Sequence, residues 1–398
     1  MRLYALALAI ALTLAAEAWP SECNVPASAP SLTIPLPSSP FAVTPTRDGC
    51  WIFVSLTGSG GTGAGIAVLK RSRGQIELSR VVPLKSAPTG IALTHDRKLL
   101  VAAATNATVF IDVRRTIGGA ADPVLGSFSD GRVTGSIYAN ITRNDKLLFV
   151  SEESAQSVTV IDLKRARKKK YAADAIVGKV PTGSAPIALT FSRNGKLLYT
   201  TSQAALPDWN WPRACKPEGP GIPDSILTRP EGAVIVIDVA RARKDPANAV
   251  VARVPAGCSP VRMAISPGGD RVYVTARNSN AVLAFDTAKL VSDAGHAQLA
   301  MAPVGDAPVP VAVVDKGGKV LVGNSNRFAA GNSPQTLVVL DAAKIGGRLA
   351  AVLGVIPVGA FPREMAVSAD RRTLFLTNFG SKTLQVLGFQ SMPICRPR

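Results

Sequence analysis

Residues Ser266–Asp286 read SPGGDRVYVTARNSNAVLAFD, and this stretch decides the fold. Two runs of alternating β-branched and aliphatic residues, RVYVTA and AVLAFD, are separated by the polar segment RNSN. Gly268 and Gly269 precede the first run, and such a pair is typical of a tight turn between antiparallel strands. Because the alternation favours strands over helices, the stretch predicts a turn followed by a two-stranded hairpin.

The same pattern recurs along the chain, which holds seven copies of it. Another clear copy is SADRRTLFLTNFGSKTLQVL, at Ser368–Leu387. The basic residue that opens the second strand falls at Lys98, Lys146, Lys196, Arg271, Lys319 and Arg372. The intervals are 48, 50, 75, 48 and 53 residues, and the long one contains an insertion at 203–231 in the fourth copy. Repeats of about 40–50 residues with several short strands indicate the blades of a β-propeller.

These copies resemble the repeats of the YVTN family, and the resemblance covers nearly the whole chain after its N-terminal segment. It implies an all-β fold, a single seven-bladed β-propeller at 19–398. The last copy stops after its third strand, so we expect Leu32–Leu36 to supply the fourth and close the ring without a free sheet edge. Similar propellers include lactone hydrolases and the heavy chains of amine dehydrogenases, so the resemblance does not define one function.

The first residues read as a targeting segment. A short basic start precedes an apolar run from Leu3 to Ala16, and Ala16-Glu17-Ala18 fits a small-x-small cleavage site. The run is short for a membrane-spanning helix, which needs about 20 apolar residues. We therefore predict a cleaved signal peptide at 1–18, and a mature protein that is exported, periplasmic or extracellular, and does not span the membrane. The alternative is an uncleaved membrane anchor.

Export permits disulfides, and all five cysteines follow the predicted signal peptide. Cys215 in the insertion and Cys258 just after the fourth copy belong to one face of the ring, so we predict that they form a disulfide. Cys23, Cys50 and Cys395 fall on the opposite face, where two of them are expected to pair. A Cys23–Cys395 disulfide would staple the ring closure, although the residues leave all three pairings open.

Strand order defines two faces of the predicted ring. The loops that join second to third strands, and each copy to the next, share a face that we call the top. Polar residues around the axial channel on this face could orient a small anionic or sugar-like ligand. The candidates are Glu152, Arg262, Arg277, Asn324, Arg363, Glu364 and Asn378. The alternative is that these residues form salt bridges between blades.

The insertion at 203–231 also belongs to the top face. Trp209 and Trp211 flank Asn210, and five prolines stiffen the residues that follow. Long loops in compact domains tend to be functional or disordered. We predict that the Cys215–Cys258 disulfide pins this loop over the channel mouth and places both tryptophans near the ligand. The alternative is a loop packed flat on the rim, with its tryptophans merely buried.

The opposite face, the bottom, is strongly basic. The chain carries a net charge of +18, and many of its cations fall in the turns between third and fourth strands. The densest positions are Arg165, Arg167, Lys168, Lys169, Lys170, Arg241, Arg243 and Lys244. A clustered positive field attracts polyanions, so an anionic surface or polyanion is a candidate partner. The alternative is a set of solvated turn residues.

No catalytic motif is present in the sequence. His95 and His296 lack metal-ligand spacing, and no cofactor fingerprint occurs, so we expect neither a metal nor a cofactor. An Asp recurs at the end of the third strand of most copies, and we expect it to satisfy the backbone of the turn that follows. Its positions are Asp112, Asp162, Asp238, Asp286 and Asp341.

The favoured function is therefore that of a monomeric, non-enzymatic module that binds a protein or a small-molecule ligand. Because similar propellers include lactone hydrolases, a hydrolase at the top channel is an alternative. It would use Glu152 or Glu364 as general base, with Arg262 and Arg363 to hold the substrate.

Overall fold

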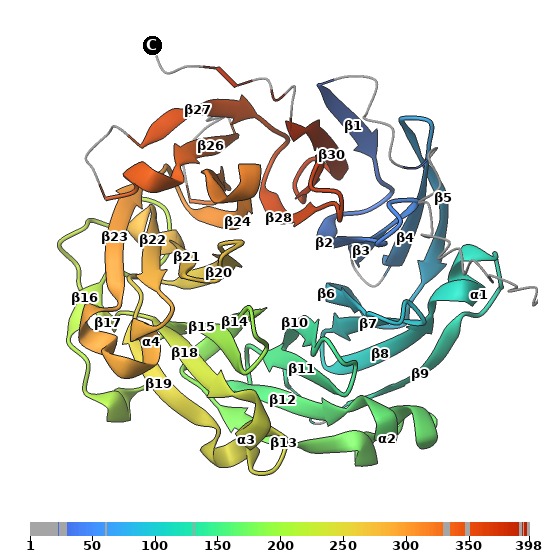
Figure 1. Cartoon of the computed structure of the whole chain (residues 1–398), viewed down its shortest axis with the longest axis horizontal. Helices are drawn as coiled ribbons and strands as arrows, with labels where there is room; N and C mark the ends of the chain where they lie inside the picture. Colours follow the sequence, from blue (N-terminus) through green and yellow to red (C-terminus); the bar gives the residue numbers. More distant parts are fainter. Residues whose placement is uncertain are drawn as a thin grey trace, which may run out of the picture.

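The computed structural model describes Cys23, residues 30–59, 62–129, 131, 133–328, 335–346, 351–389, 392, 394 and 395. Seven four-stranded antiparallel sheets stand around a common axis (Figure 1). This is the predicted all-β, seven-bladed propeller. The predicted signal peptide at 1–18 lies outside the described residues.

Each blade runs outward from an innermost strand that borders the axis. Blade 1 contains β2 (Pro40–Pro45), β3 (Trp51–Ser59), β4 (Thr62–Ser72) and β5 (Gln75–Pro83). Blade 2 contains β6 (Pro88–Leu93), β7 (Leu99–Ala104), β8 (Ala107–Asp112) and β9 (Val124–Phe128). Blade 3 contains β10 (Ser136–Ile141), β11 (Leu147–Glu152), β12 (Ser157–Asp162) and β13 (Ile176–Pro181). Blade 4 contains β14 (Ser184–Phe191), β15 (Leu197–Ala204), β18 (Ala233–Asp238) and β19 (Val250–Pro255).

The remaining blades follow the same order. Blade 5 contains β20 (Pro260–Ile265), β21 (Arg271–Ala276), β22 (Ala281–Asp286) and β23 (Gln298–Pro303). Blade 6 contains β24 (Pro308–Val314), β25 (Lys319–Asn324), β26 (Thr336–Asp341) and β27 (Val352–Pro357). Blade 7 contains β28 (Pro362–Val367), β29 (Thr373–Asn378), β30 (Thr383–Gly388) and, as its outermost strand, β1 (Ser31–Pro35).

The ring closes where the two ends of the chain meet, as the sequence predicts. β1 pairs antiparallel with β30, with Ile34 opposite Leu384. Ile34 is buried in the cluster between blades 7 and 1, whereas its neighbour Thr33 faces solvent. The N-terminal strand therefore covers the edge that β30 would otherwise expose.

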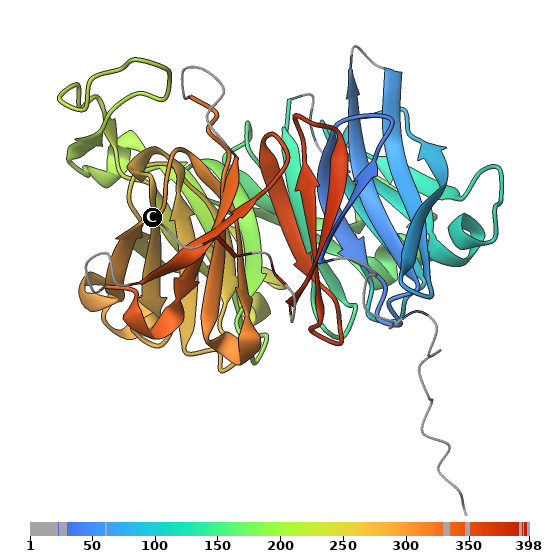
Figure 2. The same ribbon diagram turned by 90° about the horizontal axis from the view of Figure 1, so that it is seen from above.

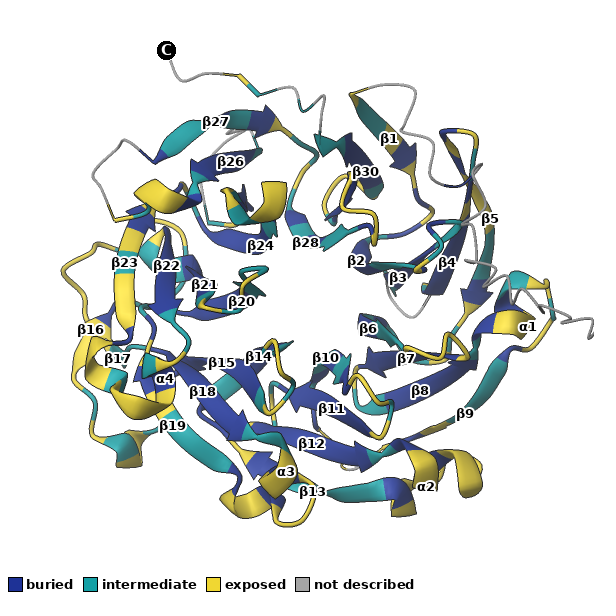
Figure 3. Cartoon of the chain, in the orientation of Figure 1, coloured by how far each residue is buried: buried dark blue, intermediate teal, exposed yellow. Residues whose placement is uncertain are grey.

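The hydrophobic core lies between blades rather than at the axis. The second and third strands of each blade are almost fully buried, whereas the outermost strands are partly exposed (Figure 3). A Phe on one of these inner strands is fully buried in five blades, at Phe53, Phe110, Phe149, Phe285 and Phe375. Each blade thus depends on its neighbours to bury its faces, which is why the ring must close to be stable.

Short helices connect the third and fourth strands of four blades. They are α1 (Val113–Ile117), α2 (Leu163–Lys168), α3 (Val239–Ala242) and α4 (Lys289–Ser292). In the first three the recurrent Asp is the N-cap, and its side chain accepts a 2.8 Å bond from the backbone N–H three residues on. The predicted role of this Asp is confirmed, but the turns expected here are helices. With four to six residues each, they are too short to leave a helical period in the sequence.

Single turns of 3-10 helix complete the connections: η1 (Ala173–Ala175), η2 (Pro207–Trp209), η3 (Pro246–Asn248), η4 (Arg277–Ser279), η5 (Ala294–His296), η6 (Asp315–Gly317) and η7 (Ala342–Lys344). The insertion of blade 4 rises above the ring (Figure 2) and contains the two-stranded ribbon of β16 (Arg213–Cys215) and β17 (Arg229–Pro230). No helix in the described ranges has the length and apolar character needed to cross a bilayer.

The structure contains two disulfides, and one of them was predicted correctly. Cys215 is bonded to Cys258, which ties the insertion to the loop that follows blade 4. The predicted Cys23–Cys395 disulfide is wrong, because Cys23 is bonded to Cys50 in the first turn of blade 1, and Cys395 is an exposed free cysteine. The reason is the path of the C-terminal segment. Cys395 forms an isolated β-bridge with Val355 of β27. It therefore lies on blade 6, away from the seam where β1 pairs with β30 and closes the ring.

Candidate functional site

A cluster of four side chains occupies the axis of the ring, and we call it the channel plug: Phe41, Tyr138, Arg262 and Glu364. Each comes from an innermost strand, and the strands belong to blades 1, 3, 5 and 7. Arg262 Nε donates to Glu364 Oε2 at 2.9 Å, and its guanidinium lies 5.1 Å from the Tyr138 ring centre and 5.8 Å from that of Phe41. Residues of non-adjacent blades can make such contacts only across the axis.

Backbone bulges aim these side chains at the axis. The pairing register shifts immediately before Tyr138, Arg262 and Glu364 in their respective strands. A bulge inserts one extra residue and so redirects the side chains that follow it. Arg262 and Glu364 are 3% and 7% exposed, so they form a buried ion pair. Burial, and to a lesser extent the Glu364 carboxylate, raise the pKa of Tyr138 and keep its hydroxyl protonated.

Arg363 lies beside the plug, toward the top of the channel. Its guanidinium stacks 4.2 Å from the Phe41 ring centre and 5.4 Å from that of Phe361. Burial, reinforced by Arg262 and other nearby arginines, lowers its pKa to about 9, so it remains charged at neutral pH. Within the described part of the chain its guanidinium has no ion pair, and Nε has no hydrogen-bond acceptor. A partly desolvated cation without a counter-ion is a natural site for an anion.

Arg277 and Arg327 extend this positive region. We call the region formed by Arg277, Arg327 and Arg363 the top mouth. The insertion contributes Glu218, whose carboxylate accepts two bonds from Arg277, at 2.6 and 3.0 Å. Burial alone would raise the pKa of Glu218, but Arg277 lowers it overall. Burial, reinforced by Arg277, lowers the pKa of Arg327. The sequence reasoning missed Glu218, because the insertion has no repeat pattern that would place its side chains.

Three other predicted residues of the top face have local structural contacts. Glu152 accepts a 2.9 Å bond from Lys179 within blade 3. Asn324 donates to the Val304 carbonyl at 2.9 Å. Asn378, fully buried, donates to Gln385 at 3.2 Å. Glu152, Asn324 and Asn378 therefore support their blades. The residues that the structure brings together at the axis are Arg262, Arg363 and Glu364, with Arg277 close by.

The tryptophans of the insertion do not reach the channel. Trp209 and Trp211 pack against each other with ring centres 5.4 Å apart, and both contact the hydrophobic cluster between blades 3 and 4. The guanidinium of Arg253, on the outermost strand β19, lies 5.0 Å above the Trp209 ring. The structure thus places the tryptophans against the blades rather than near the channel, whereas the insertion itself rises above the ring and reaches the top mouth through Glu218. Large apolar rings are more stable against the blades than in solvent.

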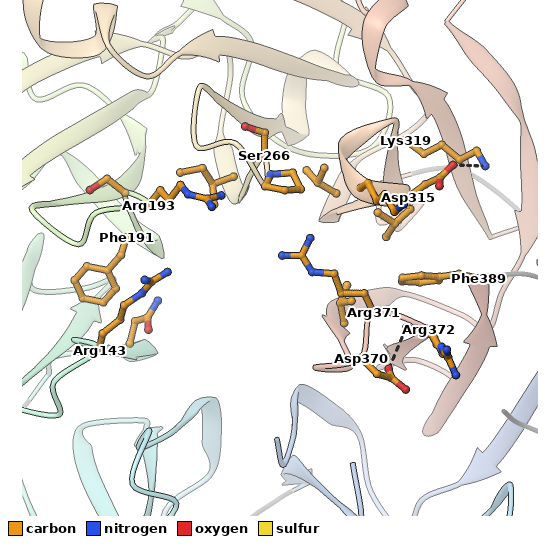
Figure 4. A pocket seen from close by; sticks show the side chains of 18 of the residues that line it. Arg143, Phe191, Arg193, Ser266, Asp315, Lys319, Asp370, Arg371, Arg372 and Phe389 are labelled. Atoms are coloured by element: carbon orange, nitrogen blue, oxygen red, sulfur yellow. Dashed lines mark hydrogen bonds and ion pairs between the residues drawn. The ribbon is translucent and has the colours of Figure 1, made fainter. Parts of the chain in front are cut away.

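The bottom end of the channel opens into a cavity of about 920 Å³ that we call the bottom mouth. Figure 4 shows Arg143, Arg193 and Arg371 directed into it from the turns between first and second strands of blades 3, 4 and 7. Its lining includes none of the plug or top-mouth residues. The plug therefore separates the channel into two mouths, each with its own set of cations.

The innermost turns hold these cations in a repeated geometry. In blade 3, Thr142 Oγ1 donates to Asn144 Oδ1 at 2.9 Å and accepts from the Leu147 N–H at 3.0 Å. Ser192 makes the equivalent bonds in blade 4. Such hydroxyl-closed turns fix the residue between the two polar side chains, here an arginine. In the sequence, a Thr-Arg or Ser-Arg dipeptide at the end of the first strand marks these arginines. They were not among the predicted cations, which belong to later turns.

The predicted polyanion-binding residues follow the third strands of blades 3 and 4, at the outer edge of the bottom face, which we call the bottom rim. Their side chains are exposed, and some of them form ion pairs or hydrogen bonds. Arg167 forms a 3.0 Å ion pair with Asp96, and Lys169 lies 3.7 Å from Asp174. Arg165 and Arg241 donate to carbonyl oxygens beyond their own helices. Four exposed cations have no such partner among the described residues: Lys168, Lys170, Arg243 and Lys244. The last two border a groove of about 420 Å³ between blades 3 and 4, together with Lys146 and Lys196.

The geometry defines a seven-bladed propeller with a plugged axial channel. The chain matches no protein-family model and no curated protein sequence. Among solved structures it is similar to hydrazine synthase of Kuenenia stuttgartiensis, with a TM-score of 0.65 and 18% identity, over 90% of this chain and 97% of that chain. At this identity the similarity shows the fold alone. Within the described ranges no three His, Cys, Asp or Glu side chains form a group that could hold a metal ion.

Proposed function

We propose that this protein is an exported propeller of the YVTN type that acts as a non-enzymatic binding module, and that its top mouth binds a small anion. The observation that carries the proposal is Arg363, a partly desolvated guanidinium without a counter-ion among the described residues. The rings of Phe41 and Phe361 both contact its guanidinium. A bound carboxylate or phosphate would supply the missing charge and accept its hydrogen bonds.

Export is supported by the two disulfides, since such bonds persist in oxidising compartments and are rare in the cytosol. The repeat pattern supports the YVTN assignment. The hydrolase alternative has less support, because both candidate bases are already engaged. Glu364 accepts from Arg262, and Glu152 accepts from Lys179, at 2.9 Å in each case.

Replacing Arg363 with Met tests the proposed anion site. With citrate and inorganic phosphate as probes, we expect the variant to lose affinity by about tenfold or more, because a charge-assisted hydrogen bond is removed. The ligand-free variant should melt at the same or a higher temperature than the wild type, since an uncompensated cation is removed from a partly buried position. Thermal shift against anion concentration measures both quantities.

The matched control is Lys382→Gln, which neutralises an exposed lysine in a loop of blade 7 on the same face. It should leave both affinity and melting temperature unchanged. Equal affinity of wild type and Arg363→Met for every anion in the panel would refute the proposed site. A lower melting temperature with unchanged affinity would show that Arg363 serves the fold instead.

A second candidate function, polyanion binding at the bottom rim, is favoured by the run of exposed cations at the end of α2, of which Lys168 and Lys170 have no partner among the described residues. We expect the triple variant Lys168→Glu, Lys169→Glu, Lys170→Glu to elute from heparin at a clearly lower salt concentration than wild type, because fewer counter-ions are released on binding. A charge-matched variant in blades 1, 6 and 7 gives the control: Lys85→Glu, Lys344→Glu and Lys382→Glu. Equal elution of the two triple variants would eliminate this function.

A further inference from the structure

The bottom mouth holds more positive charge than its own carboxylates neutralise. Five cationic residues line it whose side chains make no ion pair or hydrogen bond among the described residues: Arg143, Arg193, Lys316, Arg371 and Arg372. They are exposed and come from blades 3, 4, 6 and 7. Figure 4 shows Arg143, Arg193 and Arg371 reaching into the central space from different sides.

The acidic residues of the same cavity are already occupied. Asp315 forms a 2.9 Å ion pair with Lys319. Asp370 accepts from the Ser368 hydroxyl and from the Arg372 N–H within its own turn. The converging cations therefore keep an unneutralised positive potential over the cavity, which attracts negatively charged ligands.

Apolar side chains line the same cavity. Phe191, Phe389, Met392 and Ile394 are only partly buried and face it from blades 4, 7 and the C-terminal segment. Phe191 is held by an edge contact with Phe149, at 5.8 Å between ring centres. A volume of about 920 Å³ lies within the range of small-molecule pockets. An inorganic ion would fill little of it and would leave these apolar groups uncovered.

We infer that the bottom mouth is a second binding site, distinct from the top mouth, for an organic anion that carries at least two negative charges on an apolar body. The charged group binds the converging arginines, and the apolar body covers Phe191 and the C-terminal apolar residues. No residue of the plug or the top mouth lines this cavity, so each site can be altered by substitution without touching the other.

Three probes separate the two contributions: naphthyl phosphate, inorganic phosphate and naphthol. We expect naphthyl phosphate to bind with a dissociation constant at least about tenfold lower than that of either other probe, because only it satisfies both the charges and the apolar lining. Isothermal titration calorimetry gives the affinities and the stoichiometry. The double variant Arg143→Gln, Arg193→Gln should weaken naphthyl phosphate by about tenfold or more.

Two controls place the effect at the bottom mouth. Arg97→Gln, Lys98→Gln neutralises two exposed cations in the corresponding turn of blade 2, outside the cavity lining, and should change nothing. Arg363→Met should also leave naphthyl phosphate affinity unchanged, even if it abolishes binding of small anions at the top. The inference fails if, in the Arg363→Met background where the top mouth is disabled, inorganic phosphate binds as tightly as naphthyl phosphate, or if the two double variants bind naphthyl phosphate equally. Loss of naphthyl phosphate binding in Arg363→Met would also overturn it, by assigning the probe to the top mouth.

Discussion

Arg262→Met is expected to lower the free energy of unfolding by about 3 to 5 kcal/mol, the usual cost of removing one partner of a buried ion pair. The substitution leaves the Glu364 carboxylate 7% exposed without its guanidinium. That charge would keep the backbone N–H of Met365 as a donor, at 3.3 Å from Oε1, and the nearby Arg363, but not a direct ion pair. Urea denaturation followed by circular dichroism measures the change, and an unchanged slope with denaturant would show that the folded state keeps its compactness.

Two further variants test this explanation. Arg262→Met combined with Glu364→Gln should recover most of the lost stability, because it removes both charges and leaves no buried ion. Arg167→Met makes the same chemical change in the exposed pair with Asp96, where the side chains are 37% and 30% exposed, and should cost no more than about 1 kcal/mol. If Arg262→Met cost no more than Arg167→Met, the plug would not contain a stabilising ion pair.

Ile34→Asp is expected to cost about 4 kcal/mol or more, the range of a charge buried without a partner. Ile34 is the side chain with which β1 seals the seam, packed in the cluster between blades 7 and 1. An open seam would also expose the edge of β30, so we expect the variant to form dimers and larger assemblies through that edge. Denaturation measures the stability, and light scattering measures the assembly.

Thr33→Asp is the natural control for the seam, because it adds the same charge one residue away. Thr33 points to solvent on the same strand, so the variant should keep the assembly state of the wild type and lose less than about 1 kcal/mol. Equal losses for the two variants would mean that strand pairing alone, and not the burial of Ile34, closes the ring.

The blades could be predicted from the sequence because every copy repeats the same local code. Alternating residues mark each strand, a polar turn follows the first strand, and the missing fourth strand of the last copy identified Leu32–Leu36 as its replacement. The Cys215–Cys258 disulfide followed from strand order in the same way. Each of these predictions depended on connectivity, which repeats preserve from copy to copy.

The axial cluster could be predicted only in part. Strand order placed Arg262, Arg363 and Glu364 on the correct face, and the alternative of salt bridges between blades holds for Arg262 and Glu364, although the sequence could not name that pair. The bulges before Tyr138, Arg262 and Glu364 break the two-residue alternation on which side-chain direction depends. The alternation alone therefore could not show that Phe41 and Tyr138 meet Arg262 across the axis.

The cations of the bottom mouth were not among the predicted site residues. The predicted polyanion-binding residues belong to the turns between third and fourth strands, which lie toward the rim. The turns between first and second strands belong to the innermost strands, so their arginines surround the axis instead. Arg143 and Arg193 were visible in the sequence, and strand order alone would have placed them at the cavity.

The Cys23–Cys50 disulfide determines how the ring responds to mechanical tension. β1 lies wholly between the two bonded cysteines, so a pull on the chain before Cys23 passes through the sulfur atoms to the first hairpin of blade 1 and leaves β1 slack. Once the disulfide is reduced, the same pull acts on β1 directly. Ser31 pairs with Leu387, so tension between the two chain ends would then unzip the seam one backbone pair at a time. The oxidised protein should therefore resist forced unfolding at the seam, and single-molecule extension under oxidising and reducing conditions would measure the difference.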